Sequence, residues 1–215
     1  MRFDFLTLFP DICEAFLSES ILGRARKKGI VEFCCHQIRN YSFDKHKKVD
    51  DAPYGGGQGM LMMAEPIALC FESLCKKLKI RPYFIYMSPK GVVLNQSKIK
   101  ELSKLSNIAI LCGRYEGVDQ RVIDVFVDEE ISIGNYVVTG GELPGLILAD
   151  SISRLLDGVL SNKSCYEDES HFVEKTLEYP QYTRPAVWRK LSVPDVLKSG
   201  DYAKIQNWKN EMSKK

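Results

Sequence analysis

Apolar segments of strand length alternate with segments of helical periodicity through most of this chain, and this alternation limits its fold more than any other feature. Strands separated by helices favour βαβ units, in which neighbouring strands run parallel. The sequence therefore predicts an α/β domain built on a largely parallel sheet. Strands are expected at Phe3–Phe9, Ile30–Ile38, Tyr83–Met87, Ile108–Cys112 and Glu130–Ile133, and helices at Asp11–Gly29, Pro66–Lys79, Asn95–Leu105, Asp119–Val127 and Glu142–Leu156.

The pattern changes after the last of these helices. From Ser161 to about Tyr182 the chain is polar and acidic without a clear period, which is typical of a linker. A helical pattern returns between Val193 and Met212. At 215 residues the chain is long enough for one sizeable core and a small appendage. We therefore expect a main domain over 1–160, a flexible linker over 161–182 and a small helical domain over 183–215.

The composition places the chain among soluble globular proteins. Apolar residues make up 45% and charged residues 27% of the sequence. No apolar run approaches the roughly 20 residues that span a bilayer, and the first residues, MRFDFLTLFPDI, do not resemble a signal peptide. Seven cysteines without a CxxC pair indicate reduced thiols and no metal site. The sequence predicts a cytoplasmic protein that does not contact a membrane.

Basic residues gather in three places, although the net charge is only +2. Such clusters are compatible with contacts to nucleic-acid phosphates, but on charge alone solvated surface is the preferred interpretation. The charge pattern does not decide between these interpretations. The clusters lie at Arg24–Lys28, Lys45–Lys48 and Arg184–Lys215.

Glycine-rich loops follow three of the predicted strands. They are Ser88–Gly91, Gly113–Gly117 and Ile133–Gly141. In open α/β sheets, ligands bind outside the carboxyl ends of the strands, and glycine lets the backbone approach a ligand closely. Binding by main-chain groups suits an adenine and a ribose. Neither GxGxxG nor GxxxxGK[ST] is present, so a dinucleotide site and a P-loop lack their usual motifs.

Five sequence blocks resemble the bacterial tRNA (guanine-N1)-methyltransferases, a family of SPOUT methyltransferases. They are VDDAPYGGGQGMLMMAEP from Val49, LCGRYEGVDQR from Leu111, SIGNYVVTGGELP from Ser132, LEYPQYTRP from Leu177 and VPDVLKSGDYAKIQNW from Val193. Their order and spacing agree with the family over essentially the whole chain. The resemblance implies a SPOUT-type parallel-sheet domain with a deep trefoil knot, followed by a small helical domain that binds tRNA.

The same resemblance implies the ligands and partners. S-adenosyl-L-methionine is the expected methyl donor, with assistance from Mg²⁺, and the expected substrate is the guanosine immediately 3′ of the anticodon, whose methylation protects the reading frame. The expected partners are the tRNA anticodon stem-loop and a second copy of the chain, with no role for DNA. The residues expected around the donor are Tyr86, Ser88, Pro89, Gly113, Gly117, Ile133, Gly134, Asn135, Tyr136, Val137, Val138, Gly140, Gly141 and Pro144, and those expected beside the guanine are Tyr54, Gly55, Gly56, Gly57 and Gly59.

The reaction requires a base, because N1 of guanine carries a proton and has no free lone pair. A carboxylate can remove that proton, and an arginine can stabilise the charge that develops on O6. The resemblance assigns the arginine to Arg154 and places Glu116 near the methyl group. The family commonly has Asp-Ser-Phe in the linker, whereas this chain has EDESHF, so Asp168 is the first candidate for the base and Glu169 the second.

Two other functions fit parts of the sequence. A SPOUT enzyme could methylate a ribose or another RNA, but such enzymes lack the block from Asp51 to Met60. A non-catalytic RNA-binding relative would be expected to lose Arg154 or the linker acids, and this chain retains them. The chain ends soon after Trp208, earlier than is usual in the family, which bears on how tightly the small domain holds tRNA.

Overall fold

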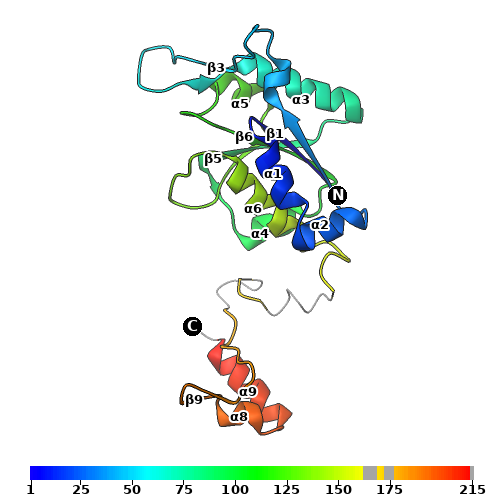
Figure 1. Cartoon of the computed structure of the whole chain (residues 1–215), viewed down its shortest axis with the longest axis vertical. Coiled ribbons are helices and arrows are strands. Elements are labelled where there is room, and N and C mark those ends of the chain that lie inside the picture. Colours follow the sequence, from blue (N-terminus) through cyan, green and yellow to red (C-terminus); the bar gives the residue numbers. More distant parts are fainter. Residues whose placement is uncertain (162–168, 172–176, 214–215) are drawn as a thin grey trace. The chain divides into compact units, whose positions relative to one another are not determined.

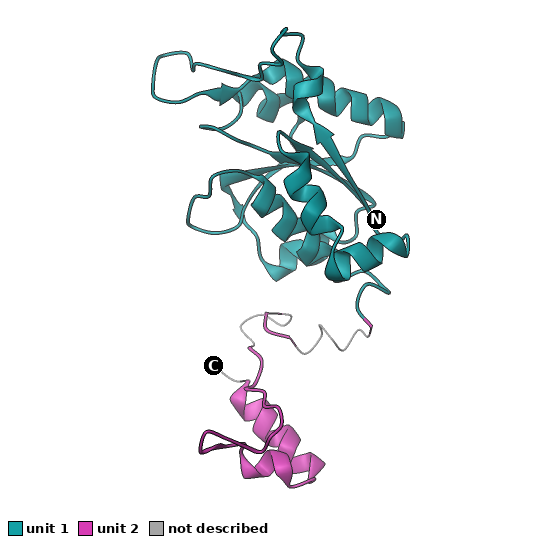
Figure 2. Cartoon of the chain, viewed as in Figure 1, with its two compact units in different colours: residues 1–160 teal, residues 161–215 magenta. Residues whose placement is uncertain are grey.

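The protein is described here by a computed structural model that covers residues 1–161, 169–171 and 177–213. The chain divides into two compact units, Met1–Leu160 and Ser161–Lys215, shown in Figure 2. Within the described residues, no helix has both the length and the apolar character needed to cross a membrane. The six cysteines among these residues are free thiols.

A five-stranded sheet forms the centre of the first unit (Figure 1). Every neighbouring pair of its strands is parallel, so all carboxyl ends meet at one edge. The predicted α/β class with a parallel sheet is confirmed. In spatial order the strands are β2 (Glu32–Gln37), β1 (Arg2–Thr7), β6 (Asn107–Cys112), β5 (Tyr83–Val93) and β7 (Glu129–Ser132).

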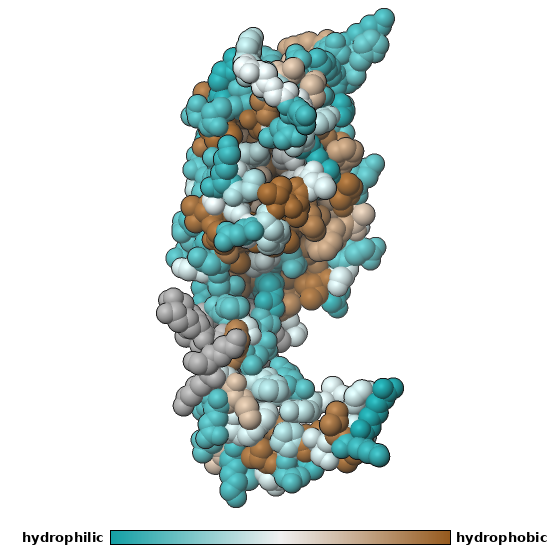
Figure 3. All heavy atoms as spheres, turned by 90° about the vertical axis from the view of Figure 1, so that its left-hand side faces the viewer, coloured by the Kyte–Doolittle hydropathy of each residue, from teal (hydrophilic) through white to brown (hydrophobic). Residues whose placement is uncertain are grey.

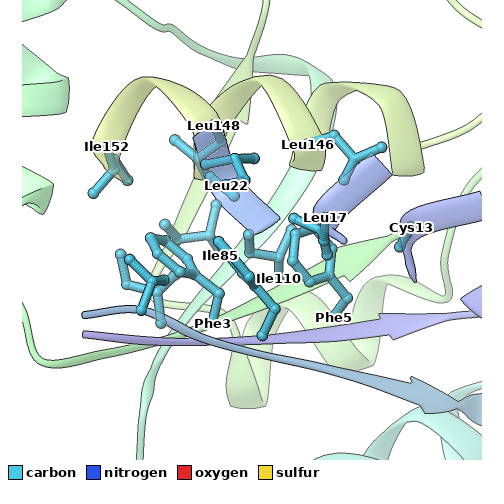
Figure 4. Packing of buried hydrophobic residues seen from close by; sticks show 14 of the residues in the cluster. Phe3, Phe5, Cys13, Leu17, Leu22, Ile85, Ile110, Leu146, Leu148 and Ile152 are labelled. Carbon is cyan, nitrogen blue, oxygen red and sulfur yellow. The ribbon is translucent and has the colours of Figure 1, made fainter. Parts of the chain in front are cut away.

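Helices cover both faces of this sheet, because alternate residues of each strand point to opposite faces. Phe3 and Phe5 of β1 enter one core and Leu6 enters the other. Figure 4 shows the first core, in which Leu146, Leu148 and Ile152 lie over the sheet. On that face lie α1 (Pro10–Leu17), α2 (Ser20–Lys27), α4 (Gln96–Leu102) and α6 (Glu142–Ser153), and on the other face lie η1 (Ile38–Tyr41), α3 (Ala64–Leu78) and α5 (Gln120–Phe126).

Several predicted elements differ from the structure. The expected helix Asp11–Gly29 is two helices, broken at Ser18 and Glu19, and the break allows Leu17 and Leu22 both to be buried. The expected strand Tyr83–Met87 extends to Val93 as β5, with a bulge between Met87 and Val92. The loop Ser88–Gly91 is therefore an outward bulge within one strand.

The last helix of the first unit is shorter than predicted. Helix α6 ends at Ser153, and Arg154 is its C-terminal cap. Asp157 and Gly158 follow a few residues later. Gly158 has a φ of 85°, so an α-helix cannot continue through it. Three further hydrogen bonds of turn type continue from Leu155 to Val159.

Short hairpins complete the two units. In the first unit, β3 (Asp50–Asp51) pairs with β4 (Leu61–Met62) and closes the loop that holds the glycine run. In the second unit, β8 (Val187–Trp188) pairs with β9 (Leu191–Ser192), ahead of α8 (Asp195–Lys198) and α9 (Tyr202–Met212). Trp208 of α9 lies against Tyr179 and Tyr182, which gives this small unit an aromatic centre.

Candidate active site

A cavity of about 520 Å³ lies at the carboxyl edge of the sheet, where the three glycine-rich loops meet. Most of the residues expected to hold the donor line it. Gly134 and Asn135 belong to the same loop as their lining neighbours but do not line the cavity themselves. The expected residues in the wall are Tyr86, Ser88, Pro89, Gly113, Gly117, Ile133, Tyr136, Val137, Val138, Gly140, Gly141 and Pro144.

Main-chain hydrogen bonds tie these loops to one another and to the sheet. The amide of Gly141 donates to the carbonyl of Gly113 at 2.8 Å, which joins the second loop to the third. Inside the third loop, the hydroxyl of Ser132 donates to the carbonyl of Gly134 at 3.0 Å. The first loop lies against β7, because a Cβ on Gly91 would come within 2.4 Å of the backbone of Glu130. The cavity therefore has walls of fixed backbone.

The wall suits S-adenosyl-L-methionine. Close packing leaves no room for a side chain at Gly113, where a Cβ would meet the ring of Tyr86 at 2.9 Å. Tyr86 is buried, and burial followed by the charge of Glu130 raises the pKa of its phenol to about 12. A neutral phenol and backbone amides are suitable partners for an adenine and a ribose.

An ion pair that the sequence does not predict anchors two of the loops. The Nε of Arg114 lies 2.8 Å from Oε2 of Glu142, and Glu142 is almost fully buried at the start of α6. The hydroxyl of Thr7 donates to the other oxygen of this carboxylate at 2.7 Å. Arg114 also donates to the carbonyl of Thr139 at 3.3 Å and lies over the ring of Phe9. Arg114 thus links the loops 113–117 and 133–141 to the sheet.

Glu116 lines the cavity and contacts the loop expected beside the guanine. Its amide donates to the carbonyl of Met60 at 3.0 Å. Gly59 has a φ of 86°, and a Cβ there would meet the Glu116 side chain at 2.4 Å, so only glycine fits this position. Gly59 and Glu116 therefore lie side by side. Tyr54 and Gly55–Gly57 are exposed and do not line the cavity.

The remaining candidates lie elsewhere. Arg154 is partly buried at the end of α6 and does not line the cavity. Its amide donates to the carbonyl of Asp150 at 3.1 Å. Burial raises the pKa of the Asp150 carboxyl, and the charge of Arg154 partly offsets this effect. Glu169 belongs to the second unit, and Asp168 lies outside the described residues.

The contact between the second and third loops leads to a testable prediction. In Gly141→Ala, the new methyl group would lie 2.7 Å from the Cα of Cys112 and from the amide of Gly113. Backbone cannot yield as a flexible side chain can, so the loops must separate. Overpacking of this kind costs about 1–3 kcal/mol, and we expect the Kd for S-adenosyl-L-methionine in calorimetry to rise about 5- to 150-fold.

Gly56→Ala is the matched control for this substitution. Gly56 has a φ of 78°, so alanine there is strained, but no atom lies within 4 Å of the added methyl group. Donor binding should stay close to the wild-type value in this variant. An equal loss of donor affinity in both variants would show that donor binding does not depend on the contact between the loops.

Comparison with known proteins places the chain in a family. The family model described as "tRNA (Guanine-1)-methyltransferase TrmD" matches residues 1–215. A tRNA (guanine-N(1)-)-methyltransferase of Ruminiclostridium cellulolyticum is 52% identical over 99% of this chain and 91% of its own length. The tRNA (guanine-N(1)-)-methyltransferase of Clostridioides difficile is 51% identical over 99% of this chain and 92% of its own length. The crystal structure of tRNA (m1G37) methyltransferase from Aquifex aeolicus superposes with a TM-score of 0.83 at 39% identity, covering 97% of this chain and 87% of that one. This chain belongs to the tRNA (guanine-1)-methyltransferase family.

Proposed function

We propose that this protein transfers a methyl group from S-adenosyl-L-methionine to N1 of a guanine in tRNA, at the guanosine immediately 3′ of the anticodon. One observation carries the proposal: three glycine-rich loops close a cavity of donor size, with Glu116 and Gly59 at its side, in a chain that matches this family along its whole length. S-adenosyl-L-methionine supplies an electrophilic methyl group when it is bound.

The reaction class is tested by incubating the wild-type protein with labelled S-adenosyl-L-methionine and mixed tRNA, followed by nucleoside analysis. The expected labelled product is 1-methylguanosine. A label on a ribose 2′-oxygen would instead indicate the alternative SPOUT activity. Donor binding without any transfer would favour the non-catalytic RNA-binding relative.

The residues of the chain have two tasks in this reaction. A carboxylate of the segment 161–182 removes the N1 proton, with Asp168 as the first candidate and Glu169 as the second. The guanidinium of Arg154 stabilises the negative charge that develops on O6. Glu116, which lines the cavity, would hold the guanine against the donor. The base must be ionised to act, so the rate should fall as the pH decreases through the pKa of that carboxyl.

We also propose that the protein acts as a homodimer whose partner supplies Arg154. Arg154 follows helix α6, and at a rise of about 1.5 Å per residue it stands about 18 Å along the axis from Glu142 at the cavity end. It therefore cannot serve the cavity of its own chain through that helix. Helices α1 and α6 pack together. Large apolar side chains are exposed on both helices and at Phe9, the residue before α1; those on the helices are Ile12, Phe16, Leu143 and Ile147.

These side chains form a surface suited to a second copy. Ile12 and Phe16 are four residues apart on α1, and Leu143 and Ile147 are four apart on α6, so each pair lies on one helix face. Apolar patches of this kind on a folded protein usually mark an interface. Figure 3 shows that apolar side chains gather on one face of the first unit.

Mixing Arg154→Ala with Gly141→Ala tests whether the partner completes the site, at a donor concentration well below the Kd of Gly141→Ala, where that variant loses most of its activity. The Arg154→Ala variant still has intact donor-binding loops, and the Gly141→Ala variant still has Arg154. After subunit exchange, half of the dimers are hybrids with one complete site each, so activity should return to about a quarter of the wild-type rate. If Arg154 acts in its own chain, the mixture should stay as inactive as either variant alone. Sedimentation of each variant checks that both still form dimers.

Several further expectations belong to this proposal. Residues 161–182 would act as the linker and 183–215 as the tRNA-binding domain, in which the Arg189 guanidinium lies over the Trp188 ring. The deep trefoil knot is supported by the contact between Gly113 and Gly141 and by the packing of Gly91 on β7. Assistance by Mg²⁺ and a cytoplasmic location, where tRNA is found, complete the proposal.

A further inference from the structure

A basic turn over residues 44–48 projects from the first unit. Lys45, His46, Lys47 and Lys48 are all exposed. The turn is nevertheless ordered by local hydrogen bonds: the Asp44 carboxylate accepts from the amide of His46 at 2.7 Å and from that of Lys48 at 3.2 Å. Lys47 adopts a φ of 57° at the centre of the turn. The cations are therefore displayed on a fixed backbone.

Arg39 connects this turn to the wall of the cavity. Its guanidinium donates to the carbonyl of Lys47 at 3.4 Å and to the hydroxyl of Tyr115, also at 3.4 Å. Tyr115 lines the cavity and is 47% exposed. At its other end the segment is fixed by Val49, which is buried and accepts from the amide of Met63 at 2.8 Å. The basic turn is thus joined through Arg39 to Tyr115 on the cavity wall, and Val49 fixes the segment that follows it.

The charges of the turn are only partly balanced. Lys48 pairs with Asp51 at 3.0 Å. Within the part of the chain that the structure describes, no carboxylate forms an ion pair with Lys45, Lys47 or Arg39. The Asp44 carboxylate is directed to backbone amides of the turn. A net positive surface is left beside the cavity.

We propose that this turn binds the RNA backbone close to the target nucleotide, with Lys45 and Lys47 contacting phosphates. This inference rests on the proposed function and adds a second RNA contact, on the methyltransferase unit itself. Phosphate contacts from lysine fix the position of a nucleic acid without reading its sequence. Contacts of this kind would hold the anticodon loop so that the guanosine faces the cavity.

The test compares Lys45→Gln/Lys47→Gln with Lys76→Gln/Lys77→Gln in the full-length protein. Lys76 and Lys77 are exposed on α3, outside the basic turn, and their substitution removes the same charge. Loss of two phosphate contacts should reduce the salt slope of tRNA binding by about 2 and raise the KM for tRNA about tenfold. The kcat at saturating tRNA and the Kd for S-adenosyl-L-methionine should stay within about twofold. The control pair should resemble the wild type.

The outcomes separate this inference from the proposed function. Wild-type protein that makes no 1-methylguanosine overturns the proposed function, and the inference with it. If the wild type is active but the two double variants have equal KM values for tRNA and equal salt slopes, the inference is overturned and the proposed function is not. A loss of donor affinity in Lys45→Gln/Lys47→Gln would also contradict it, because the lysines would then support the cavity itself.

Discussion

Asp168→Ala is expected to lower kcat for methyl transfer by about 10²–10⁴-fold, the usual contribution of a positioned general base. N1 of guanine cannot attack a methyl group while it holds its proton, so loss of the base affects the chemical step and leaves donor binding intact. The rate should be measured in single turnovers with saturating donor and tRNA, so that product release does not conceal the effect.

Glu169→Ala is the matched control for this prediction, because it removes a carboxylate from the adjacent position. We expect a change of only a few fold, which is the size of a local electrostatic effect. If Glu169→Ala has the large effect and Asp168→Ala the small one, Glu169 is the base. Small effects in both variants would contradict a base in this linker.

Asp4→Ala is expected to lower the free energy of unfolding by about 3–5 kcal/mol, because it removes a fully buried carboxylate from the largely buried Arg2 guanidinium and His36 ring. Asp4 is fully buried in β1. Its carboxylate is 2.8 Å from Arg2 and 2.7 Å from Nε2 of His36. Burial alone would raise the pKa of Asp4, but hydrogen bonds from His36 and Arg2 outweigh it, so the pKa lies below its ordinary value.

The sign of this shift predicts the pH dependence. A carboxyl whose pKa is lower in the folded state adds stability that is fully present above its ordinary pKa of 3.8. That stability is lost as the pH falls through the folded value. The difference between wild type and Asp4→Ala in urea unfolding should therefore be constant near neutral pH and decrease only in strong acid.

Glu32→Ala is the control for Asp4→Ala, since Glu32 also pairs with Arg2 but its side chain is 59% exposed. An exposed pair contributes at most about 1 kcal/mol, so its loss should be small. If the two substitutions lower the free energy of unfolding equally, the burial of Asp4 does not determine its contribution to stability. Stability is the proper measure here, because Asp4 is not among the residues that line the donor cavity.

Local patterns were sufficient to predict the sheet and the position of the cavity. Apolar runs such as Ile108–Cys112 mark buried strands, and parallel strands bring their following loops to one edge. The loops that contain Gly113 and Gly141 were therefore expected at the same edge, where a hydrogen bond joins the two residues. The helix α3 was also predicted to within two residues, because its apolar period and its ends are both clear in the sequence.

The features that were missed depend on contacts between distant segments. The extension of β5 to Val93 depends on its pairing with β7 on both sides of the bulge. The Arg114–Glu142 pair joins residues 28 positions apart, and nothing in either local sequence indicates it. The break between α1 and α2 follows from the shape of the core, whereas periodicity alone favours one helix.

The most direct test uses two tRNA transcripts that differ only at the position 3′ of the anticodon, one with guanosine and one with adenosine. Each is incubated with the wild-type protein and labelled S-adenosyl-L-methionine, and the labelled nucleoside is identified. We expect 1-methylguanosine from the guanosine transcript and no label in the other. Equal labelling of both transcripts, or a labelled nucleoside other than 1-methylguanosine, would contradict the proposed function.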